Sequence, residues 1–370
     1  MRRSLALPSG SWTSGASLRN NTTDRGNTRA EPVRFGVIGL NHNHIYGMTD
    51  QVLEAGGELV SFFAEEPDLA AEFAGRYPQA RQARGKAEVL EDPSIRLIAS
   101  AAIPNERAPL GVAAMRHGKD YLSDKAGFTS LEQLEEARRV TRETGRIYSV
   151  SYSERFQNRA TVRAGELVQS GAIGRVLQTV GLGPHRLRAH TRPAWFYQRE
   201  HYGGILIDIG SHQADQFLFF TGSTSAEVVA SQVANFAHPE HPELDDFGDM
   251  LLRGDGGTGY VRVDWFTPGG LPAWGDGRLT ILGTDGFIEL RKKVDIAGRP
   301  GGDHLILVDQ REARYIDCRD VDLPFGRQLL DDVRNRTETA MTQAHAFLAS
   351  ELTLKAQLHA RSATLQSVTA

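Results

Sequence analysis

The chain has 370 residues and a mass of 40.7 kDa, with 40% apolar and 24% charged residues. That length predicts two packed domains, and that balance excludes a mainly disordered protein. A formal net charge of −4 and a pI near 6.3 give no basic excess of the kind that phosphate backbones attract, so no nucleic-acid partner is expected.

The single cysteine, Cys318, excludes an internal disulfide and a zinc site built from cysteine pairs. A reducing, cytoplasmic location is therefore expected. No stretch of about 18 apolar residues occurs, so no membrane partner is expected either. Residues 1–32 are rich in Ser, Thr, Asn and Gly and are predicted to form a flexible tail.

Strands and helices alternate from Val33 onwards. Strands are predicted over residues 33–39, 58–63, 95–102, 120–122 and 146–152. Helices are predicted near Ile45, from Pro67, over residues 110–116, and from a capping box at residues 129–132 as far as Thr144. This alternation predicts a Rossmann-type dinucleotide-binding domain with a doubly wound parallel sheet over residues 33–153.

The second half lacks this alternation. Helical stretches are predicted over residues 159–169 and 325–359. Between them, strands are predicted over residues 176–182, 226–237, 249–252, 259–266, 278–282 and 287–290. Because successive strands without intervening helices pair antiparallel, residues 154–370 are predicted to form an α+β domain with a largely antiparallel open sheet. The predicted fold class is α/β.

The turn after the first strand, residues 39–44, reads Gly-Leu-Asn-His-Asn-His. It stands where dinucleotide-binding folds carry Gly-x-Gly-x-x-Gly, whose glycines allow a tight turn and close approach of a pyrophosphate. Gly39 keeps the first glycine, whereas Asn41 and His44 replace the other two. Asparagine tolerates left-handed backbone geometry, so this turn is a candidate cofactor loop. An ordinary strand-to-helix turn is the alternative.

His42 and His44 also form a His-x-His pair after a first strand, which resembles the opening of the barrel in zinc-dependent amidohydrolases. That fold needs about eight strand–helix units and further ligands at later strand ends. The antiparallel second half disagrees with it, and no metal site is predicted.

An acidic residue that holds the adenosine ribose is expected about 20 positions beyond this turn, at the end of the second strand. Ala64 occupies the position where Asp often stands, and Glu65 follows it. Glu65 is therefore the candidate ribose ligand, and a solvated charge before a helix is the alternative. This acid slightly favours NAD over NADP and leaves the choice open.

A second polar constellation lies in residues 203–215, Gly-Gly-Ile-Leu-Ile-Asp-Ile-Gly-Ser-His-Gln-Ala-Asp. On one helix, Asp208, His212 and Asp215 fall at positions i, i+4 and i+7 and form a polar stripe among apolar neighbours. A carboxylate beside an imidazole fixes the tautomer of the ring and raises its basicity, as a general base requires. A structural Asp–His pair is the alternative.

Lys125 follows a strand of the parallel sheet at the carboxyl edge, where such sheets bind ligands. A lysine above a cofactor cleft can donate to a substrate hydroxyl and stabilise developing alkoxide charge. A solvated lysine is the alternative.

Taken in order, these stretches resemble the Gfo/Idh/MocA family of oxidoreductases (glucose-fructose oxidoreductase, inositol 2-dehydrogenase and MocA). The Glu-Lys-Pro of the family resembles Asp-Lys-Ala at residues 124–126, and its Gly-Gly…Asp-x-Gly-x-His-x-x-Asp resembles residues 203–215. Further agreement in order and spacing comes from Ile-Pro-Asn at 103–105, Ser-Gly-Ala-Ile-Gly at 170–174 and Leu-Gly-Thr-Asp-Gly at 282–286. The resemblance covers about residues 33–350.

The resemblance implies hydride transfer between NAD or NADP and a secondary alcohol of a sugar, sugar derivative or cyclitol. It implies that His212 is the general base, that Asp208 is its partner and that Lys125 polarises the reacting oxygen. The cofactor cleft is expected to be lined by Gly39, Asn41, His42, Asn43, His44, Glu65, Pro104, Asn105 and Lys125. Substrate contacts are expected at Arg155, His185, Arg192, Trp195, Tyr197, Tyr202, His212 and Trp274.

Residues 154–370 are expected to serve both substrate binding and oligomerisation. An open sheet leaves one face exposed, so two subunits are expected to pack sheet to sheet in a homodimer or homotetramer. Two alternative functions stay open on the same fold: a glycosidase or lyase that uses bound NAD for transient oxidation, and a non-catalytic ligand-binding relative.

Overall fold

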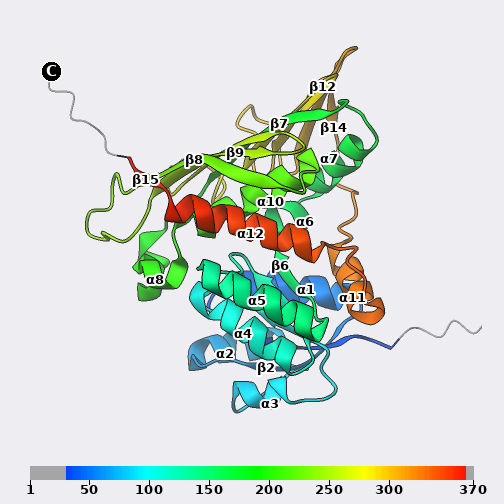
Figure 1. Ribbon diagram of the computed structural model, residues 1–370, viewed down its shortest axis with the longest axis vertical. Helices are drawn as coiled ribbons and strands as arrows, with labels where there is room; N and C mark the ends of the chain where they lie inside the picture. Colours follow the sequence, from blue (N-terminus) through cyan, green and yellow to red (C-terminus); the bar gives the residue numbers. More distant parts are fainter. Residues whose placement is uncertain (1–30, 364–370) are drawn as a thin grey trace, which may run out of the picture. The chain divides into compact units, whose positions relative to one another are not determined.

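The computed structural model describes residues 31–363. Their N-terminal part forms a sheet of six parallel strands in the order β3-β2-β1-β4-β5-β6, which is the doubly wound order of a Rossmann fold (Figure 1). The strands are β1 (Arg34–Ile38), β2 (Glu58–Phe63), β3 (Arg81–Gln82), β4 (Leu97–Ser100), β5 (Asp120–Asp124) and β6 (Tyr148–Ser151). The helices between them are α1 (His44–Glu54), α2 (Pro67–Arg76), α3 (Lys86–Leu90), α4 (Pro104–Arg116) and α5 (Leu131–Thr144). The predicted alternation is confirmed, although β3 and α3 were not among the predicted elements.

Two helix starts in this sheet domain differ from the prediction. Helix α4 begins at Pro104, six residues before the predicted start, because proline suits the first turn of a helix. The N-cap of α5 is Ser130, whose hydroxyl accepts the backbone N–H of Gln133, and the side chain of Gln133 accepts the backbone N–H of Thr129. The capping box therefore joins Ser130 and Gln133, one residue later than predicted.

The C-terminal part forms a nine-stranded sheet in the order β14-β13-β12-β11-β7-β10-β9-β8-β15. Only the β7/β10 and β8/β15 pairs are parallel, so the prediction of a largely antiparallel sheet is confirmed. Its strands are β7 (Val176–Pro184), β8 (Ala226–Ala234), β9 (Phe247–Gly254), β10 (Thr258–Asp264), β11 (Arg278–Gly283), β12 (Gly286–Arg291), β13 (His304–Asp309), β14 (Ala313–Ile316) and β15 (Arg361–Ser362). The sequence analysis missed the last three.

Helices cover one face of this sheet and fill the space towards the parallel sheet. They are α6 (Ser153–Phe156), α7 (Arg159–Gln169), α8 (Arg199–Tyr202), α9 (Ile205–Asp208), α10 (Gly210–Thr221), α11 (Phe325–Asn335) and α12 (Gln343–Leu358), with 3₁₀ turns η1 (Ala189–Thr191) and η2 (Ala194–Tyr197). Helix α10 packs on β7 and β10, whereas α12 contacts β8 on one side and α5 and β6 on the other. Figure 1 shows α12 in red between the two sheets, so one helix joins both layers of the apolar core.

The single helical stretch predicted over residues 325–359 is wrong, because the structure breaks it into α11 and α12. Arg336 adopts a left-handed conformation with φ of 58°. The carboxylate of Asp332 accepts hydrogen bonds from Thr337, Thr339 and the backbone N–H of Ala340, which satisfies the turn. No glycine or proline marks this break in the sequence.

The predicted tail, residues 1–32, lies outside the described residues except for its last two. The domain boundaries at 33–153 and 154–370 stay a prediction. Within residues 31–363, no helix is long and apolar enough to cross a membrane.

Candidate active site

A cavity of about 440 Å³ opens at the carboxyl ends of β1, β2 and β4, and we call it the β-edge cavity. Polar groups and apolar walls both line it, among them Gly39, Asn41, Phe63, Glu65, Glu66, Ile103, Asn105 and Leu110. Gly39 has φ of 81°, and a Cβ there would lie 2.5 Å from the Cβ of Ala102, so this turn requires glycine. The side-chain oxygen of Asn105 is buried and has no hydrogen-bond partner within residues 31–363, so the cavity wall has an acceptor that these residues leave unused.

A second cavity, of about 420 Å³, lies between the carboxyl edge of the parallel sheet and the segment that follows β7, and we call it the central cavity. Its lining includes the predicted site residues His42, Asn43, His44, Pro104, Lys125, His185, Arg192, Trp195, Tyr202, Asp208 and Trp274. The same two loops line both cavities, because Asn41 and Asn105 face the β-edge cavity while His42 and Pro104 face the central one. The two cavities therefore adjoin along the sheet edge.

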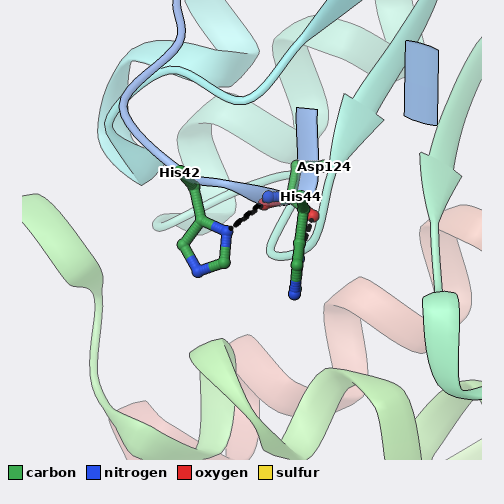
Figure 2. Close-up of side chains that lie close together, drawn as sticks. All are labelled: His42, His44 and Asp124. Carbon is green, nitrogen blue, oxygen red and sulfur yellow. Dashed lines mark hydrogen bonds and ion pairs between the residues drawn. The ribbon is translucent and has the colours of Figure 1, made fainter. Parts of the chain in front are cut away.

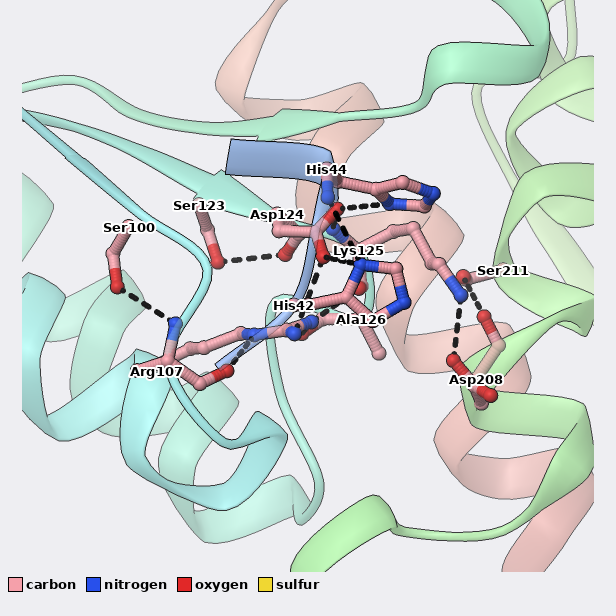
Figure 3. A network of polar contacts seen from close by, with 11 residues as sticks. His42, His44, Ser100, Arg107, Ser123, Asp124, Lys125, Ala126, Asp208 and Ser211 are labelled. Atoms are coloured by element: carbon pink, nitrogen blue, oxygen red, sulfur yellow. Dashed lines mark hydrogen bonds and ion pairs between the residues drawn. The ribbon is translucent and has the colours of Figure 1, made fainter. Parts of the chain in front are cut away.

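Asp124, the last residue of β5, is buried at the centre of a polar cluster (Figure 3). Its Oδ1 accepts hydrogen bonds from Nδ1 of His44 at 2.9 Å and from the backbone N–H of Lys125 at 2.8 Å. Its Oδ2 lies 3.2 Å from Nη2 of Arg107 and 3.7 Å from Nδ1 of His42. Burial alone raises the pKa of Asp124, but the charges of His44 and Arg107 outweigh burial and hold that pKa well below its usual value.

The carboxylate of Asp124 also fixes the tautomer of His44. A ring nitrogen that faces a carboxylate carries a proton, so Nδ1 of His44 is the donor of this hydrogen bond. Burial, together with His44, holds the pKa of His42 well below its ordinary value, so that ring is neutral. Figure 2 shows the second ring nitrogen of each histidine pointing away from Asp124.

His42, His44 and Asp124 bring ligand-type atoms within 4.8 Å of one another, which is a spacing that a metal ion requires. Hydrogen bonds already occupy Nδ1 of both histidines and one oxygen of Asp124. Nδ1 of His42 accepts the backbone N–H of His44 at 3.2 Å, and Oδ1 of Asp124 accepts two N–H groups. A cation would also lie beside the guanidinium of Arg107. We therefore interpret the cluster as a hydrogen-bonded hub that orients two imidazoles.

Lys125 and Asp208 meet across the central cavity, with Nζ 2.6 Å from Oδ1 (Figure 3). Lys125 comes from the end of the parallel sheet, where its peptide bond to Ala126 is cis, and Asp208 ends helix α9. Burial raises the pKa of Asp208, but the charge and hydrogen bond of Lys125 outweigh it and lower this pKa to about 2. The lining of the central cavity therefore includes a charged ammonium–carboxylate pair.

The polar stripe expected on one helix is interrupted. The backbone N–H of His212 bonds to the carbonyl of Ile209, three residues back, so the turn is tighter than in an α-helix and α9 ends before α10 begins. Each of the three side chains then has different surroundings. Asp208 pairs with Lys125, and Asp215 pairs with Arg155. The ring of His212 packs edge-on against the ring of Tyr152, with 6.3 Å between the ring centroids.

His212 is 2% exposed, and its Nδ1 has no hydrogen-bond partner among the described residues. Burial lowers the pKa of His212 to about 3, the nearby charge of Lys125 adds to this effect, and Glu154 opposes it. The ring is therefore neutral near pH 7 and has a lone pair available. It is not part of the central cavity lining as the structure stands.

The buried neutral His212 predicts a loss of stability in acid. The folded pKa is about 3 and the unfolded pKa about 6.5, so the unfolded chain binds more protons between these values and stability falls as pH drops below 6.5. His212→Asn is expected to reduce the slope of unfolding free energy against pH by up to about 1.4 kcal/mol per pH unit, measured by urea denaturation between pH 4.5 and 7. An unchanged slope, equal to that of an exposed His190→Asn control, would contradict the burial argument.

Arg155 is placed away from the central cavity. Its guanidinium forms two hydrogen bonds with Asp215 at 2.6 and 2.8 Å and lines a different cavity, beside Phe156 and Phe219. Tyr197 stacks on His241 with ring centroids 3.6 Å apart and is also absent from the central lining. Their placement does not support substrate contact by either residue.

Several lining residues of the central cavity were not among the predicted site residues: Arg107, Glu154, Arg186, Arg188, Trp265 and Lys293. Residues 185–192, His-Arg-Leu-Arg-Ala-His-Thr-Arg, are strongly basic, and this run was a visible signal for two of them. Arg107 is 1% exposed, and no pattern distinguishes a buried arginine from a surface one in a helix.

Comparison with known proteins identifies the family. The model of the GFO/IDH/MocA C-terminal domain matches residues 161–289. The 1,5-anhydro-D-fructose reductase of Ensifer adhaerens is 28% identical over 204 residues, 53% of this chain and 59% of that protein. The scyllo-inositol 2-dehydrogenase (NAD(+)) of Bacillus subtilis (strain 168) is 26% identical over 264 residues, 69% of this chain and 73% of that protein. The matched regions thus span between about half and three quarters of these relatives.

Solved structures agree over almost the whole described chain. A protein designated an oxidoreductase from Erwinia carotovora atroseptica superposes with a TM-score of 0.87 and 49% identity, covering 90% of this chain and 100% of that one. Levoglucosan dehydrogenase in complex with NADH and levoglucosan has the same fold, with a TM-score of 0.73 at 17% identity over 89% of this chain and 98% of that one. With the domain match, the shared motifs and this fold, the chain belongs to the Gfo/Idh/MocA family.

Proposed function

We propose that this protein is an NAD-dependent oxidoreductase that transfers hydride between the nicotinamide and a secondary alcohol of a sugar, sugar derivative or cyclitol. The observation that carries the proposal is the buried Lys125–Asp208 pair in the lining of the central cavity, which adjoins the β-edge cavity. The names of the relatives, a scyllo-inositol dehydrogenase and an anhydrofructose reductase, support the substrate class.

The β-edge cavity fits a dinucleotide. Gly39 makes the tight turn, and the N-terminus of α1, which has no side-chain cap, lies next to it, so the positive end of the helix dipole would favour a phosphate there. The unused oxygen of Asn105 suits a hydroxyl or amide donor of the cofactor. When bound, the nicotinamide supplies the hydride acceptor.

Lys125, Asp208 and His212 would have separate roles in the reaction. Lys125 would donate from Nζ to the oxygen of the substrate alcohol and stabilise its developing negative charge, while Asp208 holds that ammonium in place. His212, kept neutral by burial, would take the hydroxyl proton as the ketone forms. In the reverse direction the same groups return the proton to the carbonyl oxygen.

The charge of the β-edge cavity favours NAD over NADP. Burial raises the pKa of Glu106, and the nearby charges of Glu65 and Glu66 raise it further, so three carboxylates gather on one side of the cavity. Asn41 holds Glu66 by a hydrogen bond of 2.6 Å. These carboxylates would repel the 2′-phosphate of NADP, which adds nearly two negative charges.

We expect NAD to bind at least about tenfold more tightly than NADP, a ratio that like-charge repulsion of about 1.4 kcal/mol produces. Isothermal titration of each cofactor measures the ratio. Glu65→Gln and Glu66→Gln are expected to strengthen NADP binding and so to reduce the ratio of NAD affinity to NADP affinity. The exposed Glu143→Gln is the control and is expected to leave this ratio unchanged. Tighter binding of NADP to the native protein would contradict this assignment.

The proposed function is tested by native mass spectrometry of the purified protein with added NAD and NADP, followed by a screen of sugars and polyols for formation of reduced nicotinamide. Cofactor binding with net reduction by a polyhydroxy substrate supports the proposal. Retained NAD without net reduction, while a glycoside is cleaved, would favour the glycosidase or lyase alternative. Absence of binding by either cofactor would favour the ligand-binding alternative.

We also propose that two subunits pair through the nine-stranded sheet. Large apolar side chains on its strands are exposed in the single chain: Leu177, Val229, Leu251, Leu282 and Tyr315. An apolar group of this kind on a sheet face typically marks a protein interface. Sedimentation analysis of the native protein and of Leu251→Arg is expected to show a dimer or tetramer that the substitution weakens.

A further inference from the structure

The central cavity carries more cationic side chains than its carboxylates balance. The carboxylates in or beside it are each paired with a cation, as Asp124–Arg107, Asp208–Lys125 and Glu154–Lys292. The remaining cations of its lining form no ion pair with any residue between 31 and 363: Arg186, Arg188, Arg192 and Lys293. The cavity therefore has a net positive charge that the described chain does not neutralise.

Arg192 is the most constrained of these unpaired cations. Arg188 and Lys293 are exposed, and Arg186 directs Nη2 at the backbone carbonyls of residues 268 and 271. Arg192 is half-buried, its Nε donates to the carbonyl of Leu187 at 2.8 Å, and its two terminal nitrogens donate to no residue that the structure describes. A guanidinium edge with free N–H groups is thus held in a lining residue of the cavity.

Aromatic rings fix the position of this guanidinium. Its carbon lies 4.4 Å from the ring centroid of Phe196 and 5.0 Å from that of Trp265. These contacts and the Leu187 bond limit rotation of the side chain, so little conformational freedom is lost when a ligand binds. Burial lowers the pKa of Arg192, which reflects the cost of keeping this charge away from water without a carboxylate partner.

The chemistry of the partner follows from this arrangement. A buried cation without a partner is unfavourable, and an anion that accepts from both terminal nitrogens removes this penalty. The planar fork of a guanidinium matches a planar carboxylate in geometry. Two further buried N–H groups of the lining, Nε of Arg186 and the indole N–H of Trp265, also have no acceptor among the residues that the structure describes.

We propose that the substrate of the central cavity is a polyhydroxy carboxylate, a sugar acid whose carboxylate binds Arg192 while a secondary hydroxyl of the same molecule lies at Lys125. This inference rests on the proposed function and deepens it. Arg192 is then a specificity-determining residue that selects anionic over neutral sugars. The cofactor phosphates do not account for it, because the Gly39 turn lines the β-edge cavity, whereas Arg192 lines the central cavity.

The test is calorimetric titration of the full chain, with and without saturating NAD, using pairs of sugars that differ in one carboxylate. The pairs are D-glucuronate with D-glucose, D-galacturonate with D-galactose, and D-gluconate with D-glucitol, and D-glucose 6-phosphate is a separate arm. In at least one pair the acid is expected to bind ten to a hundred times more tightly, as a charge-assisted bidentate contact provides. Equal binding within all three pairs overturns the proposal, and tighter binding of the phosphate than of every acid overturns the choice of carboxylate.

Arg192→Met keeps the stem that packs on Phe196 and removes the charge. It is expected to abolish the preference for the acid while leaving the affinities for NAD and for the neutral sugar within about twofold. Arg192→Lys keeps the positive charge but not the paired N–H donors of the guanidinium, so it is expected to retain part of the preference for the acid. This variant remains informative if Arg192→Met unfolds. The exposed Arg163→Gln is the matched control and keeps the full preference. An equal loss for acid and neutral sugar in Arg192→Met overturns the assignment.

Different outcomes would overturn the proposed function and the proposed carboxylate site. NAD binding and sugar oxidation without any preference for acids would overturn this inference and leave the proposed function standing. A preference for acids that depends on Arg192, in a protein that binds neither cofactor, would overturn the proposed function and support the anion site.

Discussion

Lys125→Met is expected to lower kcat by about 10²- to 10³-fold, with the affinity for NAD within about twofold of the native value. Methionine keeps the length of the side chain but removes the ammonium that lies 2.6 Å from Asp208. Loss of one preorganised electrostatic group at a developing oxyanion has an effect of this size. Initial rates of NAD reduction with the best substrate of the screen give kcat and KM, and isothermal titration gives NAD affinity.

The same substitution leaves Asp208 buried without its partner, so a control for folding is needed. Burial then acts on the carboxyl unopposed and its pKa rises. Asp208→Asn in the Lys125→Met background is expected to restore thermal stability without restoring activity, because the two groups act as a unit. Lys355→Met, which breaks an exposed ion pair with Glu351, is the surface control. A Lys125→Met enzyme with native kcat would remove Lys125 from the mechanism.

The parallel sheet could be predicted because its signals are local. Continuous apolar runs, such as residues 58–63, end at turn residues, and β2 has the predicted bounds Glu58–Phe63. Helix α7 likewise has the predicted bounds Arg159–Gln169, since Asn158 caps its start by accepting the N–H of Thr161. In both cases one short window of sequence holds the information that fixes the element.

The elements that were missed or merged depend on distant contacts. Strand β14 has four residues, none of them buried, and forms only by pairing with β13. The break between α11 and α12 depends on Asp332, which satisfies three residues of the following turn. An Asp inside an apolar helical pattern looks like a solvated charge, so the sequence has no local signal for this break.

Motif spacing indicated Lys125 and Asp208 as candidate site residues, but it did not predict that they pair with each other. Lys125 and Asp208 lie 83 positions apart, and the parallel sheet and α9 bring them together. The spacing instead favoured a pair between Asp208 and His212, which the tightened turn at Ile209 separates. Which side chains pair in such a site depends on how far the helix is rotated about its axis, by less than one turn. Composition and periodicity do not determine that rotation.

Asp215→Ala is expected to destabilise the protein by about 3–5 kcal/mol, because it leaves a buried guanidinium without a partner. Asp215 is 0% exposed and accepts from Nη2 of Arg155 at 2.6 Å, from Nε of Arg155 at 2.8 Å and from Nε2 of His345 at 2.8 Å. These bonds join α10 to α6 and α12. Burial raises the pKa of Asp215, but Arg155 outweighs it and lowers that pKa to about 2, so the pair is charged. Thermal unfolding should show a Tm lower by roughly 10 °C.

Two comparisons separate a structural role of Asp215 from a catalytic one. Glu136→Ala removes an exposed partner of Arg139 and is expected to lower the free energy of unfolding by less than about 1 kcal/mol. An equal loss of unfolding free energy in Glu136→Ala and Asp215→Ala would contradict the burial argument. The double substitution Asp215→Leu with Arg155→Met is expected to lower the free energy of unfolding less than Asp215→Ala alone. The reason is that it leaves neither charge of this pair without its partner. If this double variant still binds NAD and turns over substrate at temperatures below its Tm, the role of Asp215 is structural, because it joins helices. Catalysis would then depend on Lys125 and Asp208 and not on Asp215.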